Sequence, residues 1–235
     1  MAGFKTHITA SGILGIGYGG IAFGFYDVPL STSILAGGLC GVSGMLPDID
    51  SGPGVPLRES MAFAAAVVPM MMIDRLRQFG MPPEFIVLTG AGIYLTIRFM
   101  LAAMLRRYTV HRGMFHSIPA AIIFGEIAFL LASGDLDMRI YKAGGVVAGY
   151  MSHLILDELY SLEWYRGRLR LKKSFGTAVK LISRNWLSNV STYLKLAMFT
   201  VLVFKEPTWM QQFNDQHIEP KVEQAATEVI DQYMR

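Results

Sequence analysis

Two histidines and an arginine lie close together in the stretch 110-VHRGMFHSIP-119, which apolar sequence flanks on both sides. Histidine is scarce in this chain, with five in 235 residues. Ser117 is typical of a helix N-cap, with a proline in the first turn that would follow. The imidazoles of His111 and His116 could bind a metal ion here. The planar guanidinium of Arg112 could bind a phosphate or a carboxylate.

A histidine and an aspartate occur four residues apart in the stretch 152-SHLILDEL-159. On a helix, His153 and Asp157 would share one face and could bind the same ion. They could also form a buried hydrogen bond with each other. Ionisable residues this deep in an apolar helix are costly unless they are paired or functional, so the pair is a candidate site.

Two further segments carry possible ligands. Asp48 and Asp50 precede a turn rich in glycine and proline, where carboxylates either cap the turn or offer oxygens to a cation. His7 comes just before the first long apolar stretch, as an interfacial histidine or a ligand would. The single cysteine, Cys40, excludes an intrachain disulfide and a cysteine-based zinc site, and we read it as a small buried residue.

The elements that must position these donors are apolar. Hydrophobic residues make up 52% of the chain and charged residues only 17%, whereas a soluble domain carries about a quarter charged residues. The mean hydropathy is +0.39. We therefore predict an all-α fold, a polytopic transmembrane helical bundle with a short amphipathic C-terminal helix. The membrane-embedded domain with the metal site would cover residues 1–204, and the polar tail helix residues 205–235.

Seven stretches are candidate membrane spans. The first two contain no charged residue, approach the roughly 20 residues that cross a bilayer, and are rich in glycine, which favours close helix packing. Two others, Ser60–Ile73 and Thr192–Phe204, are short for a full span. The seven candidates are Ile8–Tyr26, Val28–Pro47, Ser60–Ile73, Phe85–Leu105, Ile118–Ser133, Ala143–Leu159 and Thr192–Phe204.

Basic residues predict the orientation. They concentrate in Arg106–Arg112 and Ser161–Ser183, which should therefore face the cytoplasm. The N-terminus and residues 47–59 then lie on the same side, and residues 134–142 form an outer turn. The loop 74–84 fits less well, because it falls outside although it carries two arginines. With this orientation, four separate segments bring His or Asp to one membrane face.

Nitrogen and carboxylate donors without thiolate suit zinc, manganese or iron. The donors outnumber the four ligands of a tetrahedral zinc, so one or two divalent ions could bind. Such a site favours hydrolysis, most naturally of a phosphoester. The candidate metal ligands are His7, Asp48, Asp50, His111, His116, His153 and Asp157. The candidate catalytic residues are Asp50, as ligand or general base, and Arg112, as the binder of the anionic group.

The series 6-TH-7, 46-LPDID-50, 111-HRGMFHS-117 and 153-HLILD-157 resembles the YdjM-like membrane-bound, metal-dependent hydrolases of the bacterial inner membrane over residues 5–160. That family is distantly similar to zinc-dependent phospholipase C and to zinc-dependent single-strand-specific nucleases. The resemblance implies ligand roles for the histidines and aspartates of these motifs. After Asp157 the sequence departs from the family pattern, so the role of residues beyond it stays open.

The partners implied are membrane lipids and a lipid-phosphate substrate. Nucleic acid is disfavoured, because no aromatic stacking platform accompanies the basic run 166-RGRLRLKK-173, which alternates like a surface strand or an interfacial segment. Two alternatives stay open: a non-catalytic membrane protein whose His/Asp cluster is a structural metal or hydrogen-bond site, and a transporter. Arg98 and Glu126 each interrupt an apolar stretch. We expect them to pair with each other inside the bundle, and the alternative is that they form a polar path toward the site.

Overall fold

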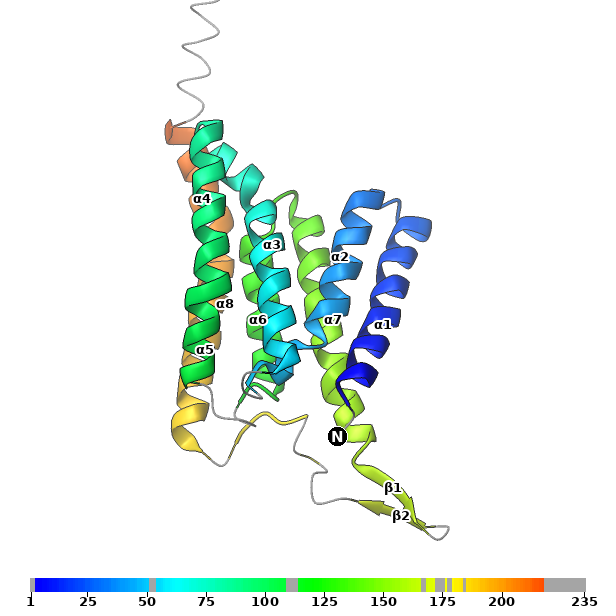
Figure 1. The fold of residues 1–235 in the computed structure, drawn as a ribbon. Coiled ribbons are helices and arrows are strands. Elements are labelled where there is room, and N and C mark those ends of the chain that lie inside the picture. The colour runs from blue at the N-terminus through cyan, green and yellow to red at the C-terminus, as the bar shows by residue number, and fades with distance from the viewer. Residues whose placement is uncertain are drawn as a thin grey trace, which may run out of the picture.

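The structure is a computed structural model that describes residues 3–50, 54–108, 114–165, 168–171, 176, 179–183 and 185–217. This part of the chain forms a bundle of roughly parallel helices with a small β-hairpin at one end (Figure 1). The predicted all-α class is confirmed. The α-helices are α1 (Phe4–Phe25), α2 (Leu30–Ser43), α3 (Val55–Gln78), α4 (Pro83–Leu95), α5 (Ala102–Tyr108), α6 (Ile118–Leu131), α7 (Leu136–Leu159) and α8 (Trp186–His217).

Two short helical turns and two strands complete the fold. The 3₁₀ helix η1 (Leu46–Asp50) follows α2, and the π-helical turn η2 (Thr96–Leu101) joins α4 to α5 without a break. Strands β1 (Leu162–Tyr165) and β2 (Arg168–Leu171) pair antiparallel. The alternation of basic and apolar residues in the 166–173 run is therefore that of a strand over residues 168–171.

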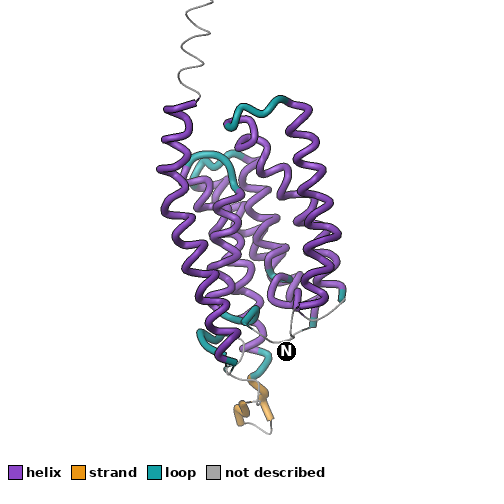
Figure 2. The backbone as a smooth tube through the Cα atoms, turned by 90° about the vertical axis from the view of Figure 1, so that its left-hand side faces the viewer, coloured by secondary structure: helices purple, strands orange, loops and turns teal. Residues whose placement is uncertain are grey.

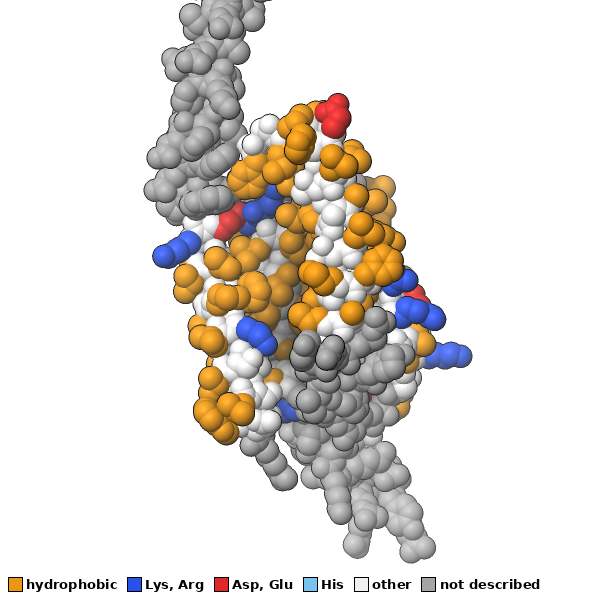
Figure 3. Space-filling view, turned by 60° about the vertical axis from the view of Figure 1, so that its left-hand side comes forward, with side chains coloured by type: hydrophobic (Ala, Val, Ile, Leu, Met, Phe, Trp, Pro, Cys, Tyr) orange, Lys and Arg blue, Asp and Glu red, His pale blue; other side chains and the backbone are white. Residues whose placement is uncertain are grey.

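Four helical stretches in the described residues are long and apolar enough to cross a membrane: Phe4–Phe25, Val55–Gln78, Pro83–Leu105 and Trp186–Glu206. Two predicted spans were placed too narrowly. The stretch predicted at Ser60–Ile73 belongs to a 24-residue helix, and the one at Thr192–Phe204 belongs to α8. Hydrophobic side chains are spread along the helices over the described part of the face seen in Figure 3, with few charged side chains among them. Membrane helices have this surface because lipid, not water, surrounds them.

Helices α1, α2 and α7 pack closely because small residues line their interfaces. A Cβ atom built on Gly15 would lie 2.3 Å from the Gly37 carbonyl oxygen, and one built on Gly149 would lie 1.8 Å from the Cys40 carbonyl oxygen. Neither backbone could approach so closely with a larger residue. Cys40 itself is fully buried, as predicted. The glycines that mark the first two apolar stretches thus bring the backbones of these helices into contact.

The segments that carry the candidate site residues lie at one end of the bundle. The start of α1, the 3₁₀ helix η1, the end of α5 and the β-hairpin lie together, and the connections α1–α2, α3–α4 and α6–α7 lie at the opposite end (Figures 1 and 2). This agrees with the predicted order of crossings. That the first of these ends faces the cytoplasm stays a prediction.

The pairing expected for Arg98 and Glu126 is wrong. Arg98 donates a hydrogen bond to the Arg58 carbonyl oxygen, and Glu126 accepts one from the Thr200 hydroxyl at 2.6 Å. The two residues lie on helices that pack against different neighbours, α3 for η2 and α8 for α6. Helix α8 also continues through the predicted boundary at residue 204 as far as His217, and residues 218–235 lie outside the described part.

Candidate metal centre

Four elements bring histidine and aspartate side chains together at the end of the bundle where α1 begins. His7 lies in the first turn of α1, inside the helix and not before it as predicted, and it is 2% exposed. Asp48 comes from η1, directly after α2. His116 precedes α6, and the pair His153 and Asp157 lies in the last turns of α7. Residues 150 positions apart in the sequence are thus neighbours.

The side chains lie within a few ångströms of one another. Nε2 of His7 is 3.2 Å from Oδ1 of Asp157, and Nε2 of His153 is 3.7 Å from the other oxygen, Oδ2. Oδ1 of Asp48 lies 3.4 Å from Nε2 of His116 and 3.7 Å from Nε2 of His153. The rings of His7 and His153 stack with centroids 3.6 Å apart. The imidazoles therefore surround the two carboxylates.

Two overlapping sets of side chains have the spacing of metal ligands. One consists of His7, Asp48 and His153, and the other of His116, His153 and Asp157, with the ligand atoms of each set within 4.8 Å of one another. His153 belongs to both sets. A single ion could bind at either, and two neighbouring ions could bind if another ligand replaced His153 in one set.

The orientation of His153 is fixed by the backbone. Its Nδ1 lies 2.7 Å from the carbonyl oxygen of Gly44, which can only accept a hydrogen bond, so Nδ1 carries the proton. Nε2 then has a free lone pair that points toward the carboxylates. A backbone carbonyl that fixes the tautomer in this way is the usual partner of a metal-binding histidine.

Several imidazole nitrogens in the cluster are buried without a hydrogen-bond partner. They are Nδ1 of His7, both ring nitrogens of His116 and Nε2 of His153. Buried polar atoms in proteins are nearly always bonded, and leaving one unsatisfied costs about 1–3 kcal/mol. Nε2 of His116 and Nε2 of His153 both face Asp48 and Asp157. A cation between these carboxylates would satisfy the Nε2 atoms of His116 and His153, so the residues present fit a divalent metal.

Asp48 is the most open of the described ligands, with 23% of its side chain exposed, against 2% for His116 and Asp157. Its partial burial by itself would raise the pKa of its carboxyl. The neighbouring imidazoles of His116, His153 and His7 outweigh burial, so the pKa lies below its usual value. Asp48 is therefore an anion at neutral pH, as a metal ligand must be.

Three predicted site residues cannot be placed with the others. His111 and Arg112 lie outside the described residues, and the same holds for the side chain of Asp50, whose backbone ends η1. Their predicted roles stay predictions. The structure brings together the remaining five, which are His7, Asp48, His116, His153 and Asp157.

The support for the cluster comes partly from residues that the sequence did not single out. Ser117 caps α6 as predicted, accepting from the Ala120 amide at 3.3 Å. The Tyr150 hydroxyl donates to the carbonyl oxygen of Phe115, which fixes the backbone just before His116. Ser11 donates to the Gly41 carbonyl oxygen at 2.6 Å and so ties α1 to α2. Nothing in the local sequence distinguishes Tyr150 and Ser11 from the other polar residues of α7 and α1.

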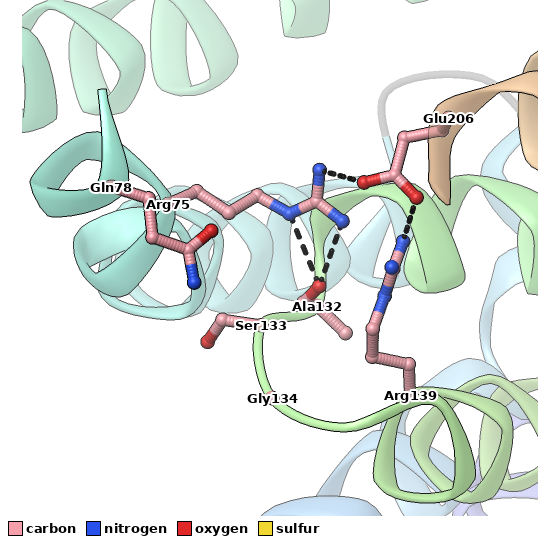
Figure 4. A pocket seen from close by; sticks show the side chains of 7 residues that line it. All are labelled: Arg75, Gln78, Ala132, Ser133, Gly134, Arg139 and Glu206. Carbon is pink, nitrogen blue, oxygen red and sulfur yellow. Dashed lines mark hydrogen bonds and ion pairs between the residues drawn. The ribbon is translucent and has the colours of Figure 1, made fainter. Parts of the chain in front are cut away.

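A second polar cluster lies at the opposite end of the bundle, and no motif or spacing in the sequence predicts it. Glu206 on α8 lies between two arginines: its carboxylate is 2.6 Å from Arg75 of α3 and 2.7 Å from Arg139 of α7 (Figure 4). Arg75 also donates to the carbonyl oxygen of Ala132. Arg75 is thus paired within the bundle, near the end of α3.

These observations define a class: a multi-pass helical membrane protein whose buried His–Asp cluster is a candidate metal centre. The chain belongs to the YdjM inner membrane protein family, whose model matches residues 1–170. The expected family is thus confirmed, and all five clustered residues lie within the match. No curated protein and no solved structure matches the chain. The likeness to zinc-dependent phospholipase C stays a prediction.

Proposed function

We propose that this protein is a membrane-bound, metal-dependent hydrolase that acts on a phosphoester at the membrane face where the His–Asp cluster lies. The observation that carries the proposal is the convergence of buried imidazole nitrogens without partners on two carboxylates from different elements. An apolar bundle would not retain such a group without a role, because its burial is costly.

The proposed ligands follow from the geometry. His153 offers Nε2 because its Nδ1 is bonded to Gly44, so it can bind one ion and not two. Asp157 directs one oxygen to His7 and the other to His116 and His153, so both of its oxygens would be available to hold a metal. Zinc fits this set of nitrogen and oxygen donors, as do manganese and iron.

A bound divalent metal would supply a Lewis acid that polarises a phosphoryl oxygen. The chain itself would bind and orient the substrate and move protons. We assign the binding of the anionic group to Arg112 and the acceptance of a proton from the attacking water to Asp50, both by sequence alone. Asp48 is the partly exposed member of the described cluster, so we expect the substrate to approach from its side.

The test is elemental analysis of the detergent-purified protein, combined with hydrolysis assays on phosphomonoesters and phosphodiesters. We expect a stoichiometric divalent metal in the wild type. Metal affinity should fall at least about tenfold in His153→Ala, since even the loss of a group that only supports a ligand lowers affinity about 10–100-fold. His217→Ala, which changes the histidine at the end of α8, is the control. A wild type without metal, or unchanged metal content in His153→Ala, would refute the proposal.

A structural metal site is the second candidate, because the cluster joins α1, η1, α7 and the segment before α6 at one point. The same preparations separate the two functions. If metal is bound and His116→Ala lowers stability, but no phosphoester is hydrolysed by the wild type, the site is structural. If hydrolysis occurs and disappears with the metal, it is catalytic.

A further inference from the structure

Arg98 is a charged residue inside an otherwise apolar part of the bundle. It belongs to the π-helical turn η2, inside the stretch Pro83–Leu105, which is long and apolar enough to cross a membrane and only 6% buried in its most apolar part. A π-turn inserts an extra residue into a helix and redirects the side chains that follow, and such turns occur frequently at functional sites.

The guanidinium of Arg98 points toward the start of α3. Its Nη1 makes a long hydrogen bond, 3.5 Å, to the carbonyl oxygen of Arg58. Among the described residues, no carboxylate lies within ion-pair distance of Arg98. The Arg58 guanidinium contacts Glu59 at 2.8 Å, but both side chains are largely exposed, so this pair is weak and can open. Two arginines against one glutamate leave a local positive charge.

Arg58 and Arg98 each follow a residue that packs in the apolar cluster around Ile49. Ile49, the neighbour of Asp48, packs in one apolar cluster with Leu57, the residue before Arg58. Ile97, the residue before Arg98, packs against the same cluster. The start of α3 and the turn η2, which carry the two arginines, thus pack against η1, which carries Asp48.

The surface around Arg98 is that of a lipid-facing helix. Its neighbours Phe99 and Met100 are 62% and 67% exposed, and Leu95, one turn earlier, is also exposed. An arginine in such a helix directs its guanidinium toward the headgroup layer, because burial of the charge in hydrocarbon costs several kcal/mol. Guanidinium groups also match phosphate geometry better than lysine does.

We propose that Arg58 and Arg98 bind the phosphate of an anionic phospholipid whose acyl chains lie along η2 and α4, on elements that pack against the helix carrying Asp48. This site deepens the proposed function by naming a lipid phosphate as the substrate class. The binding itself does not require the metal.

The test measures retention of phosphatidylglycerol by the full-length protein in native mass spectrometry, with phosphatidylcholine for comparison. We expect preferential retention of phosphatidylglycerol by the wild type and about a fivefold loss in Arg98→Leu, the attraction of one basic residue for anionic lipid. Arg98→Lys should retain an intermediate amount. Lys195→Leu is the matched control, because Lys195 is also an exposed cation in an apolar span. It should behave as the wild type.

Two further measurements keep the test decisive. Arg58→Gln, which changes an exposed residue, should also weaken retention, so a folding defect in Arg98→Leu would leave a usable variant. Glycerol phosphate at the same concentration should not displace the lipid, and displacement would show that a free phosphate is the ligand and overturn the proposal. Unchanged retention in both arginine variants would also overturn it. Metal content is measured on the same samples, so loss of the metal with lipid still retained would refute only the proposed hydrolase.

Discussion

Both ends of the bundle bury polar groups, but these groups are paired with one another at one end and partly unpaired at the other. At one end, Glu206 lies between Arg75 and Arg139, and the arginines also donate to backbone carbonyls. At the other end, imidazole nitrogens of His116 and His153 are buried without a partner. The first cluster is complete within the protein and is what a structural ion network requires. The second is incomplete, which is the condition of a site that binds something from outside.

The two clusters also differ in what they join. Arg75, Arg139 and Glu206 hold α8 to α3 and α7, although α8 lies outside the part of the chain that the family model matches. The His–Asp cluster joins elements that all lie within the match. A stability role at one end and a chemical role at the other would separate under mutation, and four predictions test that separation.

Glu206→Ala should destabilise the protein most. It leaves two largely buried guanidinium groups without their carboxylate, and breaking a buried ion pair costs about 3–5 kcal/mol. Thermal unfolding in detergent measures the effect. The neighbouring Lys205→Ala, at an exposed position, should change little. Metal content per folded protein should stay at the wild-type value, and a loss of metal in Glu206→Ala would mean that the two ends are not independent.

Removal of the metal with a chelator should lower stability through the end of the bundle that carries the His–Asp cluster. A ligand present at 100 times its Kd stabilises the folded state by about 2.7 kcal/mol, and a chelator abolishes that contribution. The melting temperature should therefore fall in the wild type and in Glu206→Ala, but much less in His153→Ala, which holds little metal. An equal fall in all three proteins would show that the chelator does not act at the His–Asp cluster.

Gly149→Ala should disturb the packing that brings α7 to α2. The new Cβ would overlap the Cys40 carbonyl oxygen, and overpacking of this kind costs about 1–3 kcal/mol. Because His153 lies one turn further along α7, metal binding should weaken as well. Gly38→Ala is the control, since a Cβ atom there meets nothing within 4 Å. If both variants behave alike in unfolding and metal titration, close packing does not position the site.

Ser117→Ala should give the smallest change. It removes the N-cap of α6, which accepts from the Ala120 amide, and a lost cap costs about 1 kcal/mol. Since His116 precedes the cap, metal affinity should fall slightly while the Glu206 end is unaffected. The exposed Ser191→Ala on α8 serves as control. Urea unfolding and metal titration measure the two effects, and a change in stability equal to that of Ser191→Ala would exclude a role for the cap.

The sequence alone determined the helical membrane class, because long apolar stretches have only one way to satisfy their backbone in lipid. It also indicated the ligand types, since a histidine and an aspartate four residues apart must share a helix face, as His153 and Asp157 do. Basic residues predicted the order of crossings that the helices follow. Ser117 and its proline located the start of α6.

Only the tertiary structure decided which polar groups meet. The Glu206 network was invisible because Arg75, Arg139 and Glu206 come from three helices and no spacing relates them. The expected pairing of Arg98 with Glu126 failed for the same reason: which helices become neighbours depends on packing, which local sequence does not encode. The backbone carbonyl of Gly44, which fixes His153, carries no side-chain information at all. Residue types and their spacing along a helix indicate which chemical groups share a face. Which groups become partners inside the bundle depends on how the helices of the whole chain pack.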